Sequence, residues 1–132
     1  MRNAKATLTE QELEIMKVIW SLETATVRNV YETLLERRRI AYTTVMTMMN
    51  ILETKGYLKK HQEDRAYVYR PSQPKKQVIR SMVREFVDRV FNGSVEPLLV
   101  HLVEDKHLSG KDLEEIRRAI NAGTRQAGTR KE

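Results

Sequence analysis

Residues 40–70 read IAYTTVMTMMNILETKGYLKKHQEDRAYVYR, and this stretch decides the fold. Its first half has the spacing of an amphipathic helix, because apolar side chains recur at i, i+3, i+4 and i+7. The members of this apolar stripe are Val45, Met48, Met49 and Leu52. Gly56 stands where a C-cap would end the helix. We therefore predict a helix that packs one side on a core and ends near Gly56.

The opposite side of this predicted helix carries polar and thioether side chains without a charge. A solvated helix face usually carries Lys and Glu, whereas small hydroxyls, an amide and a thioether fit base edges and thymine methyl groups in a DNA major groove. We predict that this side faces bases. Its members are Thr43, Met46, Thr47 and Asn50.

Two strand-like runs follow, at residues 57–61 and 66–70, on either side of Glu63-Asp64-Arg65. Tyr67 and Tyr69 share one side of the second run, which is the period-2 signal of a strand. A helix followed directly by a basic hairpin is the order of a winged helix-turn-helix.

The net charge of +6 favours a polyanionic partner, and its placement is more informative than its size. Residues 37–70 hold eight Lys or Arg residues against three Asp or Glu residues, a net charge of +5. The eight cations are Arg37, Arg38, Arg39, Lys55, Lys59, Lys60, Arg65 and Arg70. A cluster of this kind around the predicted recognition helix indicates contacts with phosphates.

Two shorter helices are expected before this stretch. Thr9 to Glu12 has the pattern of a capping box, Leu8 and Leu13 can form a hydrophobic staple, and Trp20 lies in the core stripe. Thr26 can cap a second helix, and Arg37–Arg39 form the turn into the third. Two helices and a turn before a helix with an uncharged polar side is the helix-turn-helix order.

Pro71 and Pro74 mark the end of this module, and three apolar helices are expected after them, with Ser94 and Ser109 as caps of the second and third. Three helices this apolar, in about 60 residues, need a surface to pack on, and a second copy of the chain is the simplest one. The predicted dimerisation residues are Ile79, Met82, Phe86, Leu98, Leu99, Leu102, Leu113, Ile116 and Ile120.

The predicted fold is therefore mainly α with a small β-wing: a winged helix-turn-helix followed by a three-helix dimerisation module. The expected domains are residues 1–72 for DNA binding and 73–121 for homodimerisation, with 122–132 as a disordered tail without periodicity. The N-terminus lacks an apolar leader and no apolar run is long enough for a membrane span, so we expect a soluble cytoplasmic protein.

Signs of catalysis or metal binding are missing from the sequence. It contains no cysteine, and His61, His101 and His107 fit no metal-ligand spacing. It also contains no GxSxG, P-loop or GxGxxG pattern. We predict a protein that is not an enzyme, has no catalytic residues, binds no metal or cofactor, and shows no evident small-molecule ligand.

Several segments together closely resemble the penicillinase-repressor family (BlaI/MecI type), in order and without obvious gaps from residue 8 to about 120. They are LTEQELEIMKVIW (8–20), YTTVMTM (42–48), LETKG (52–56), EDRAYVY (63–69), NGS (92–94) and LSGKDLEEIR (108–117). The resemblance implies a homodimeric repressor with an N-terminal winged helix and a C-terminal dimerisation module. It also implies a dyad-symmetric operator and, in several members, removal by proteolysis after a membrane sensor metalloprotease detects a β-lactam.

The resemblance also assigns roles to single positions. Thr43, Thr44 and Thr47 match the base-facing and phosphate-facing positions of the family's third helix, and Arg65 matches the wing-tip arginine. With the wing cations and Tyr42, the predicted phosphate-facing set is Tyr42, Thr44, Lys59, Lys60 and Arg65.

His101–Leu102 matches the regulatory cleavage site, so it is the candidate proteolytic site, although antibiotic-resistance members have Asn–Phe there. Asp64 and Ile51 also depart, standing where Gly and Arg are common. The copper-responsive branch uses a C-terminal cysteine cluster, which this chain lacks.

The expected mechanism follows from the predicted helix, wing and dimer. The third helix enters the major groove, wing cations neutralise phosphates, and a dimer presents two such helices to a palindrome in double-stranded DNA. Two other classes stay open. A winged-helix protein-interaction adaptor would not need the +5 cluster or show a steep salt dependence, and an architectural DNA binder would keep the salt dependence without preferring a palindrome.

Overall fold

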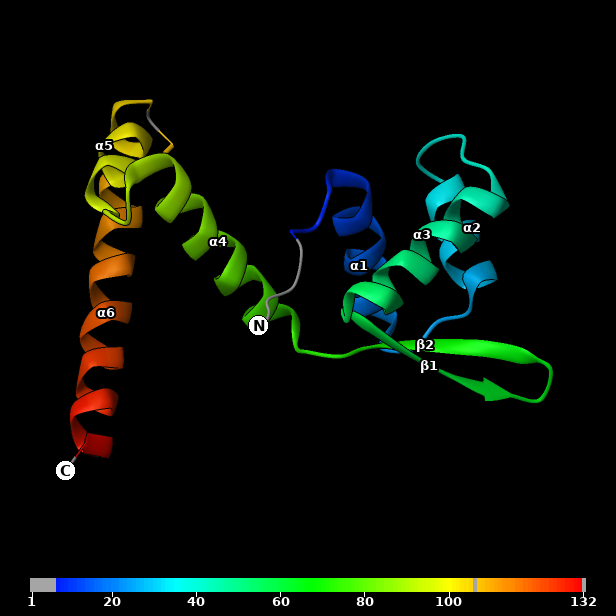
Figure 1. Ribbon diagram of the computed structural model, residues 1–132. Coiled ribbons are helices and arrows are strands. Elements are labelled where there is room, and N and C mark those ends of the chain that lie inside the picture. Colours follow the sequence, from blue (N-terminus) through cyan, green and yellow to red (C-terminus); the bar gives the residue numbers. More distant parts are fainter. Residues whose placement is uncertain (1–6, 106, 132) are drawn as a thin grey trace. The chain divides into compact units, whose positions relative to one another are not determined.

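In the described part of the chain, six helices and one two-stranded hairpin follow one another (Figure 1). The computed structural model describes residues 7–105 and 107–131, with side chains for 7–105 and 107–123. The elements are α1 (Glu10–Leu22), α2 (Val27–Leu35), α3 (Tyr42–Lys55), β1 (Leu58–Glu63), β2 (Ala66–Pro71), α4 (Lys75–Phe91), α5 (Glu96–Glu104) and α6 (Gly110–Lys131). This order confirms the predicted fold class, mainly helical with a small β-wing.

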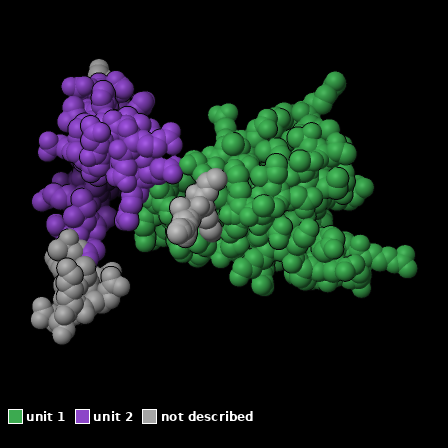
Figure 2. Space-filling view, in the orientation of Figure 1, with its two compact units in different colours: residues 1–82 green, residues 83–132 purple. Residues whose placement is uncertain are grey.

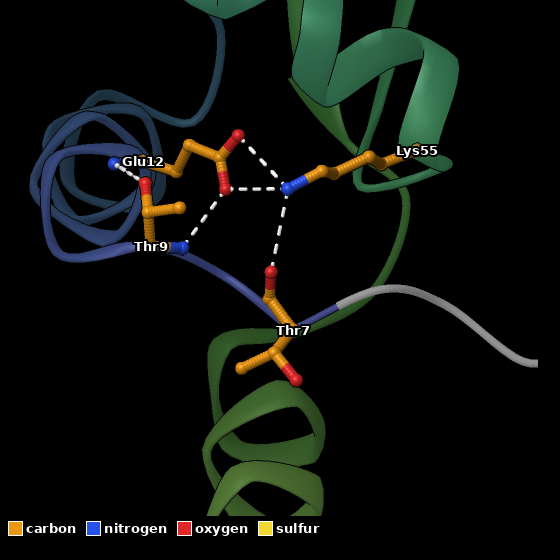
Figure 3. Close-up of polar contacts among 4 residues, drawn as sticks. All are labelled: Thr7, Thr9, Glu12 and Lys55. Atoms are coloured by element: carbon orange, nitrogen blue, oxygen red, sulfur yellow. Dashed lines mark hydrogen bonds and ion pairs between the residues drawn. The ribbon is translucent and has the colours of Figure 1, made fainter.

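The first helix begins at a capping box, as predicted. The Thr9 backbone N–H donates to Glu12 Oε1 at 2.9 Å, and the Glu12 N–H donates to Thr9 Oγ1 at 3.1 Å (Figure 3). Leu8 is buried and Leu13 packs against the core, the placement that a hydrophobic staple requires. Two backbone donors of the first turn are thereby satisfied, and α1 has a defined first residue.

The second helix begins in the same way. Thr26 Oγ1 accepts from the Asn29 N–H at 3.1 Å, and Asn29 Oδ1 accepts from the Thr26 N–H at 2.9 Å. The predicted Thr26 cap is confirmed. Val30 and Leu34 are fully buried on the inner side of α2.

The third helix has the two sides that its spacing predicted. Val45, Met49 and Leu52 are fully buried. Gly56 ends the helix in the left-handed conformation, at φ 92°. Its N–H donates to Glu53 O at 3.1 Å and the Tyr57 N–H donates to Leu52 O at 2.9 Å, the pattern of a Schellman motif. The chain is thereby turned directly into the hairpin.

β1 and β2 pair antiparallel, with Leu58 opposite Pro71 and Glu63 opposite Ala66. β1 starts one residue later than predicted, because the Tyr57 N–H donates to the helix cap. It also ends two residues later than predicted, at Glu63. Tyr69 extends the sheet on the other side of β2, exchanging hydrogen bonds of 2.9 and 2.8 Å with Ala25. The wing is therefore tied to the segment between α1 and α2.

One apolar core joins α1, α2, α3 and the base of the wing. Trp20 packs at its edge, as predicted, and in the described part of the chain its buried indole Nε1 has no hydrogen-bond partner. The fully buried side chains of the core are Ile15, Met16, Ile19, Val30, Leu34, Val45, Met49, Leu52 and Leu58.

The chain divides into two compact units, residues 1–82 and 83–132 (Figure 2). The first part of α4 belongs to the winged helix, because Val78 is buried in its core and Met82 packs against it. The boundary thus differs from the predicted one at 72/73. The prolines mark a chain turn, whereas the apolar residues of α4 decide where the first core ends.

The second unit contains the end of α4, all of α5 and α6. Asn92 and Gly93 end α4 with positive φ angles of 54° and 86°, as predicted. Ser109 caps α6, exchanging bonds of 3.0 and 3.1 Å with Asp112. Ser94 does not cap α5. That helix begins at Glu96 after Val95, with Pro97 in its first turn, where a missing N–H costs nothing.

The last helix is longer than predicted. Its backbone is helical from Gly110 to Lys131, where we expected a disordered tail from residue 122. No proline interrupts this segment, its Ala, Arg, Gln and Lys residues favour helix, and the preceding turns supply the nucleus. Glu132 lies outside the described residues.

Candidate nucleic-acid interface

The uncharged side of α3 lies open to solvent. Thr43, Met46, Thr47 and Asn50 are all exposed, and Met46 keeps 39% of its surface accessible. The structure therefore brings the four predicted base-facing residues together on one free surface. Their role at bases stays a prediction.

Tyr42, the first residue of α3, contacts one aromatic and one cationic side chain of α2. The Tyr42 ring meets Tyr31 edge-on at a centroid distance of 5.3 Å, and Arg28 Cζ lies 5.9 Å from the Tyr42 centroid. Arg28 also forms a 3.4 Å ion pair with Glu32. We did not predict Arg28. The predicted Thr26 cap could have indicated this residue, because Arg28 stands two positions after the cap and so lies in the first turn of α2.

An open groove of about 610 Å³ lies between the start of α2, the outer side of α3 and the wing. Its lining includes three cations, Arg28, Lys60 and Arg65, and no carboxylate. A groove with this charge attracts a phosphate backbone. The other lining residues are Thr26, Val27, Tyr42, Met46, Asn50, Ala66, Tyr67 and Tyr69.

Asn50 is bound to the wing across this groove. Its Oδ1 accepts from Tyr69 Oη at 2.9 Å and from Lys60 Nζ at 3.4 Å. The Lys60 ammonium lies 4.7 Å from the centroid of the Tyr67 ring and 6.0 Å from that of Tyr69. Burial raises the pKa of the Tyr69 hydroxyl, and the nearby Glu53 charge adds to this, so the hydroxyl stays a donor at neutral pH.

The predicted +5 cluster separates into two sets. Arg38 forms a 2.8 Å ion pair with Glu14, and Lys55 forms one of the same length with Glu12, so both serve the packing of α1. The hydrogen bond to Glu14 raises the pKa of the Arg38 guanidinium, which stays charged. The wing and turn supply the exposed remainder, Arg37, Arg39, Lys59, Lys60, Arg65 and Arg70.

The remaining predicted phosphate-facing residues are exposed, as contact with phosphates requires. Tyr42 and Thr44 are exposed in the first turn of α3. Lys59 is exposed on β1, and Arg65 follows Asp64 at the tip of the hairpin, where Asp64 has φ 54°. The positive φ explains why a glycine suits this tip and why Asp, which tolerates that region, can replace it.

The candidate proteolytic site lies in α5. His101 is exposed and Leu102 is half-buried, and none of the nine α5 residues is buried. In the single chain α5 therefore leaves much of its apolar surface uncovered, including Leu99, Val100 and Val103.

The predicted dimerisation residues do not behave alike. Met82 packs on the core of the first unit, and Ile79, Leu98 and Leu102 are half-buried. The exposed members are Phe86, Leu99, Leu113, Ile116 and Ile120.

Among the described residues no three His, Cys, Asp or Glu side chains lie close enough to hold a metal ion together. Their helices also include none with the length and hydropathy needed to cross a membrane.

Comparisons with known proteins agree with this geometry. The chain matches the penicillinase repressor family over residues 8–122. It is 30% identical to the penicillinase repressor of Bacillus licheniformis over 109 residues, which are 83% of this chain and 85% of that protein. It is 36% identical to the transcriptional regulator BlaI of Mycobacterium tuberculosis over 115 residues, 86% and 82% of the two chains.

A solved structure resembles the winged helix. The DNA-binding domain of the repressor BlaI superposes with a TM-score of 0.51 at 31% identity, covering 56% of this chain and 90% of that one. The wing, the helix-turn-helix and the match over most of the chain lead to one assignment. The chain belongs to the penicillinase repressor family of DNA-binding transcriptional regulators.

Proposed function

We propose that this protein is a sequence-specific repressor that binds a dyad-symmetric operator in double-stranded DNA as a homodimer. The observation that carries the proposal is the exposed, uncharged side of α3 next to a groove lined by Arg28, Lys60 and Arg65. The cations would hold phosphates, and the polar side of α3 would contact base edges in the major groove. Repression follows when the bound dimer occupies a promoter.

The second unit supports pairing with a second copy. Apolar side chains of this unit keep 40–60% of their surface exposed in the single chain. Many exposed apolar side chains on a small domain are typical of an interface, and a self-complementary surface closes into a two-fold dimer. The residues concerned are Val83, Phe86, Val90, Val95, Leu99, Val100, Val103, Leu113, Ile116 and Ile120.

Release by proteolysis is the second part of the proposal. Cleavage between His101 and Leu102 would separate α6 from the winged helix and so remove Leu113, Ile116 and Ile120 from the interface. A membrane-bound sensor metalloprotease is the partner that the family resemblance implies, and we expect the chain to act in the cytoplasm, where the DNA lies. Following the chain by immunoblot during exposure of its cells to a β-lactam tests this. A chain that stays intact while its target genes are induced contradicts it.

Selection of the full chain on randomised duplex DNA, followed by footprinting, tests operator binding. We expect a palindrome whose half-sites are separated by about one helical turn or a multiple of it. Salt-dependent binding without a preferred sequence would instead identify an architectural DNA binder. No DNA binding at physiological salt would leave the protein-interaction adaptor.

Sedimentation of the full chain tests the dimer. Ile116→Glu places a charge on the exposed apolar surface of α6 and should give a monomer. Lys111→Glu introduces the same side chain at an exposed polar position of the same helix and should leave a dimer. Equal behaviour of the two variants would contradict the proposed interface.

A further inference from the structure

The contact between Asn50 and the wing has a consequence for base recognition. An Asn side chain offers one oxygen that accepts two hydrogen bonds and one NH₂ group that donates two. Tyr69 Oη at 2.9 Å and Lys60 Nζ at 3.4 Å occupy both acceptor positions of Oδ1. The NH₂ group is then the part of the exposed amide that remains for a ligand.

The orientation of the amide follows from the chemistry of its neighbours. A tyrosine hydroxyl could donate to the oxygen or accept from the nitrogen, but a lysine ammonium only donates. The amide atom that both Lys60 and Tyr69 approach must therefore be the oxygen. Turning the amide over would set its N–H groups against the ammonium and break the hydrogen bond to Lys60, although Tyr69 Oη could still accept from the nitrogen.

The two neighbours are themselves held in place. Tyr69 is only 2% exposed, and its backbone pairs with Ala25 in both directions. Lys60 lies opposite Tyr69 in the strand register, with its ammonium over the Tyr67 and Tyr69 rings. The wing thus holds the Asn50 amide from a rigid support.

We propose that Asn50 recognises a base only as a hydrogen-bond donor, and that it prefers guanine in the operator half-site. Guanine presents two acceptors, O6 and N7, in the major groove. The usual pairing of Asn with adenine needs one donor and one acceptor, and here the acceptor is already engaged. Tyr69 is the positioning residue that makes this choice, so the wing influences base preference without touching a base. The inference rests on the proposed operator binding.

Selection on randomised duplex DNA is carried out with the wild type and with Asn50→Ala. The operator position that Asn50 contacts is the one at which the wild type prefers one base and the variant does not. We expect guanine there, favoured roughly tenfold to a hundredfold over other bases. Replacing that guanine by 7-deazaguanine, which lacks the N7 acceptor, should weaken binding of the wild type and leave Asn50→Ala unaffected. An adenine or cytosine at that position, or equal effects of 7-deazaguanine on both proteins, overturns the proposal.

The role of the wing has its own test. Tyr69→Phe removes the hydroxyl that holds Oδ1, so adenine should be accepted at this position almost as well as guanine. Tyr57→Phe is the matched control, because it removes a hydroxyl from another buried tyrosine, 7% exposed, that does not line the groove. It should leave the preference unchanged. Circular dichroism establishes that both variants are folded, and an unchanged preference in a folded Tyr69→Phe overturns the positioning role.

The outcomes separate this inference from the function on which it rests. If the wild type selects a palindrome but Asn50→Ala selects the same sequence at every position, only the role of Asn50 is wrong. If the wild type selects no sequence at all, the proposed function itself is wrong.

Discussion

Lys55, the last residue of α3, contacts both carboxylate oxygens of Glu12 in the first turn of α1. Its Nζ lies 2.8 Å from Glu12 Oε1 and 2.9 Å from Oε2, and it also donates to the Thr7 carbonyl oxygen at 3.3 Å (Figure 3). The Glu12 side chain is 6% exposed and that of Lys55 is 22% exposed. The pair therefore joins the end of α3 to the start of α1 from within the fold.

This pair makes stability depend on pH. Burial by itself would raise the pKa of the Glu12 carboxyl, but the hydrogen bonds from Lys55 and Thr9 and the Lys55 charge together lower it below its ordinary value of 4.5. As the pH falls, the Glu12 carboxylate is therefore protonated in the unfolded chain before it is protonated in the folded one. The contribution of Glu12 to stability is complete above the ordinary pKa and is lost as the pH falls through the folded pKa.

Comparison with Glu12→Gln isolates this effect, because Gln can still form the capping box. We expect the difference in unfolding free energy between wild type and variant to be largest near neutral pH and to shrink as the pH falls below 4.5. Urea unfolding at a series of pH values measures it. A difference that stays constant with pH would contradict the assignment.

Removing the Lys55 cation should lower the free energy of unfolding more than removing the charge of Glu12. Lys55→Met keeps the apolar stem but leaves the buried carboxylate without its partner, so we expect about 2–3 kcal/mol of destabilisation. Lys59→Met removes an exposed wing lysine and should change stability by less than about 0.5 kcal/mol. Denaturant midpoints compare them, and equal small losses would show that the pair contributes little.

Thr47→Ala and Arg65→Ala should weaken DNA binding in different ways. Thr47 lies on the polar side of α3, so its loss should cost roughly 1–3 kcal/mol on the selected operator and little on random DNA. Arg65, at the wing tip, should weaken binding to both and reduce the salt slope by about 0.9 for one lost phosphate contact. Fluorescence anisotropy against salt measures both. A changed base preference in Arg65→Ala would make the wing tip a base reader.

A fragment of residues 1–82 should fold as a monomeric winged helix and should be more stable than a fragment of residues 1–72. The longer fragment keeps Val78, which is 3% exposed, and Met82, which packs on the core. Burying a side chain of this kind contributes about 2 kcal/mol. Thermal unfolding and sedimentation of the two fragments measure stability and association. Equal stability would place the boundary at the prolines after all, and a dimeric 1–82 would place the interface in the wrong unit.

Local features could be predicted from the sequence because neighbouring residues decide them. The caps at Thr9 and Thr26 join residues three apart, and the left-handed turn at Gly56 needs a residue without a Cβ. The two sides of α3 follow from the helical period alone. These signals, read in order, were enough for the winged helix-turn-helix and for the exposed polar side of α3.

Only the tertiary structure decided which polar groups remain free for DNA. Lys55 meets Glu12 43 residues away, Arg38 meets Glu14 24 residues away, and Asn50 meets Tyr69 19 residues away. No local period predicts such pairs, because they depend on how helices and wing pack together. The sequence therefore determined the elements and the faces they present. Packing determined that two cations of the basic cluster stabilise α1, that Arg28 joins the groove, and that the Asn50 amide is held by the wing, since each of these depends on distances that arise only when the core has formed.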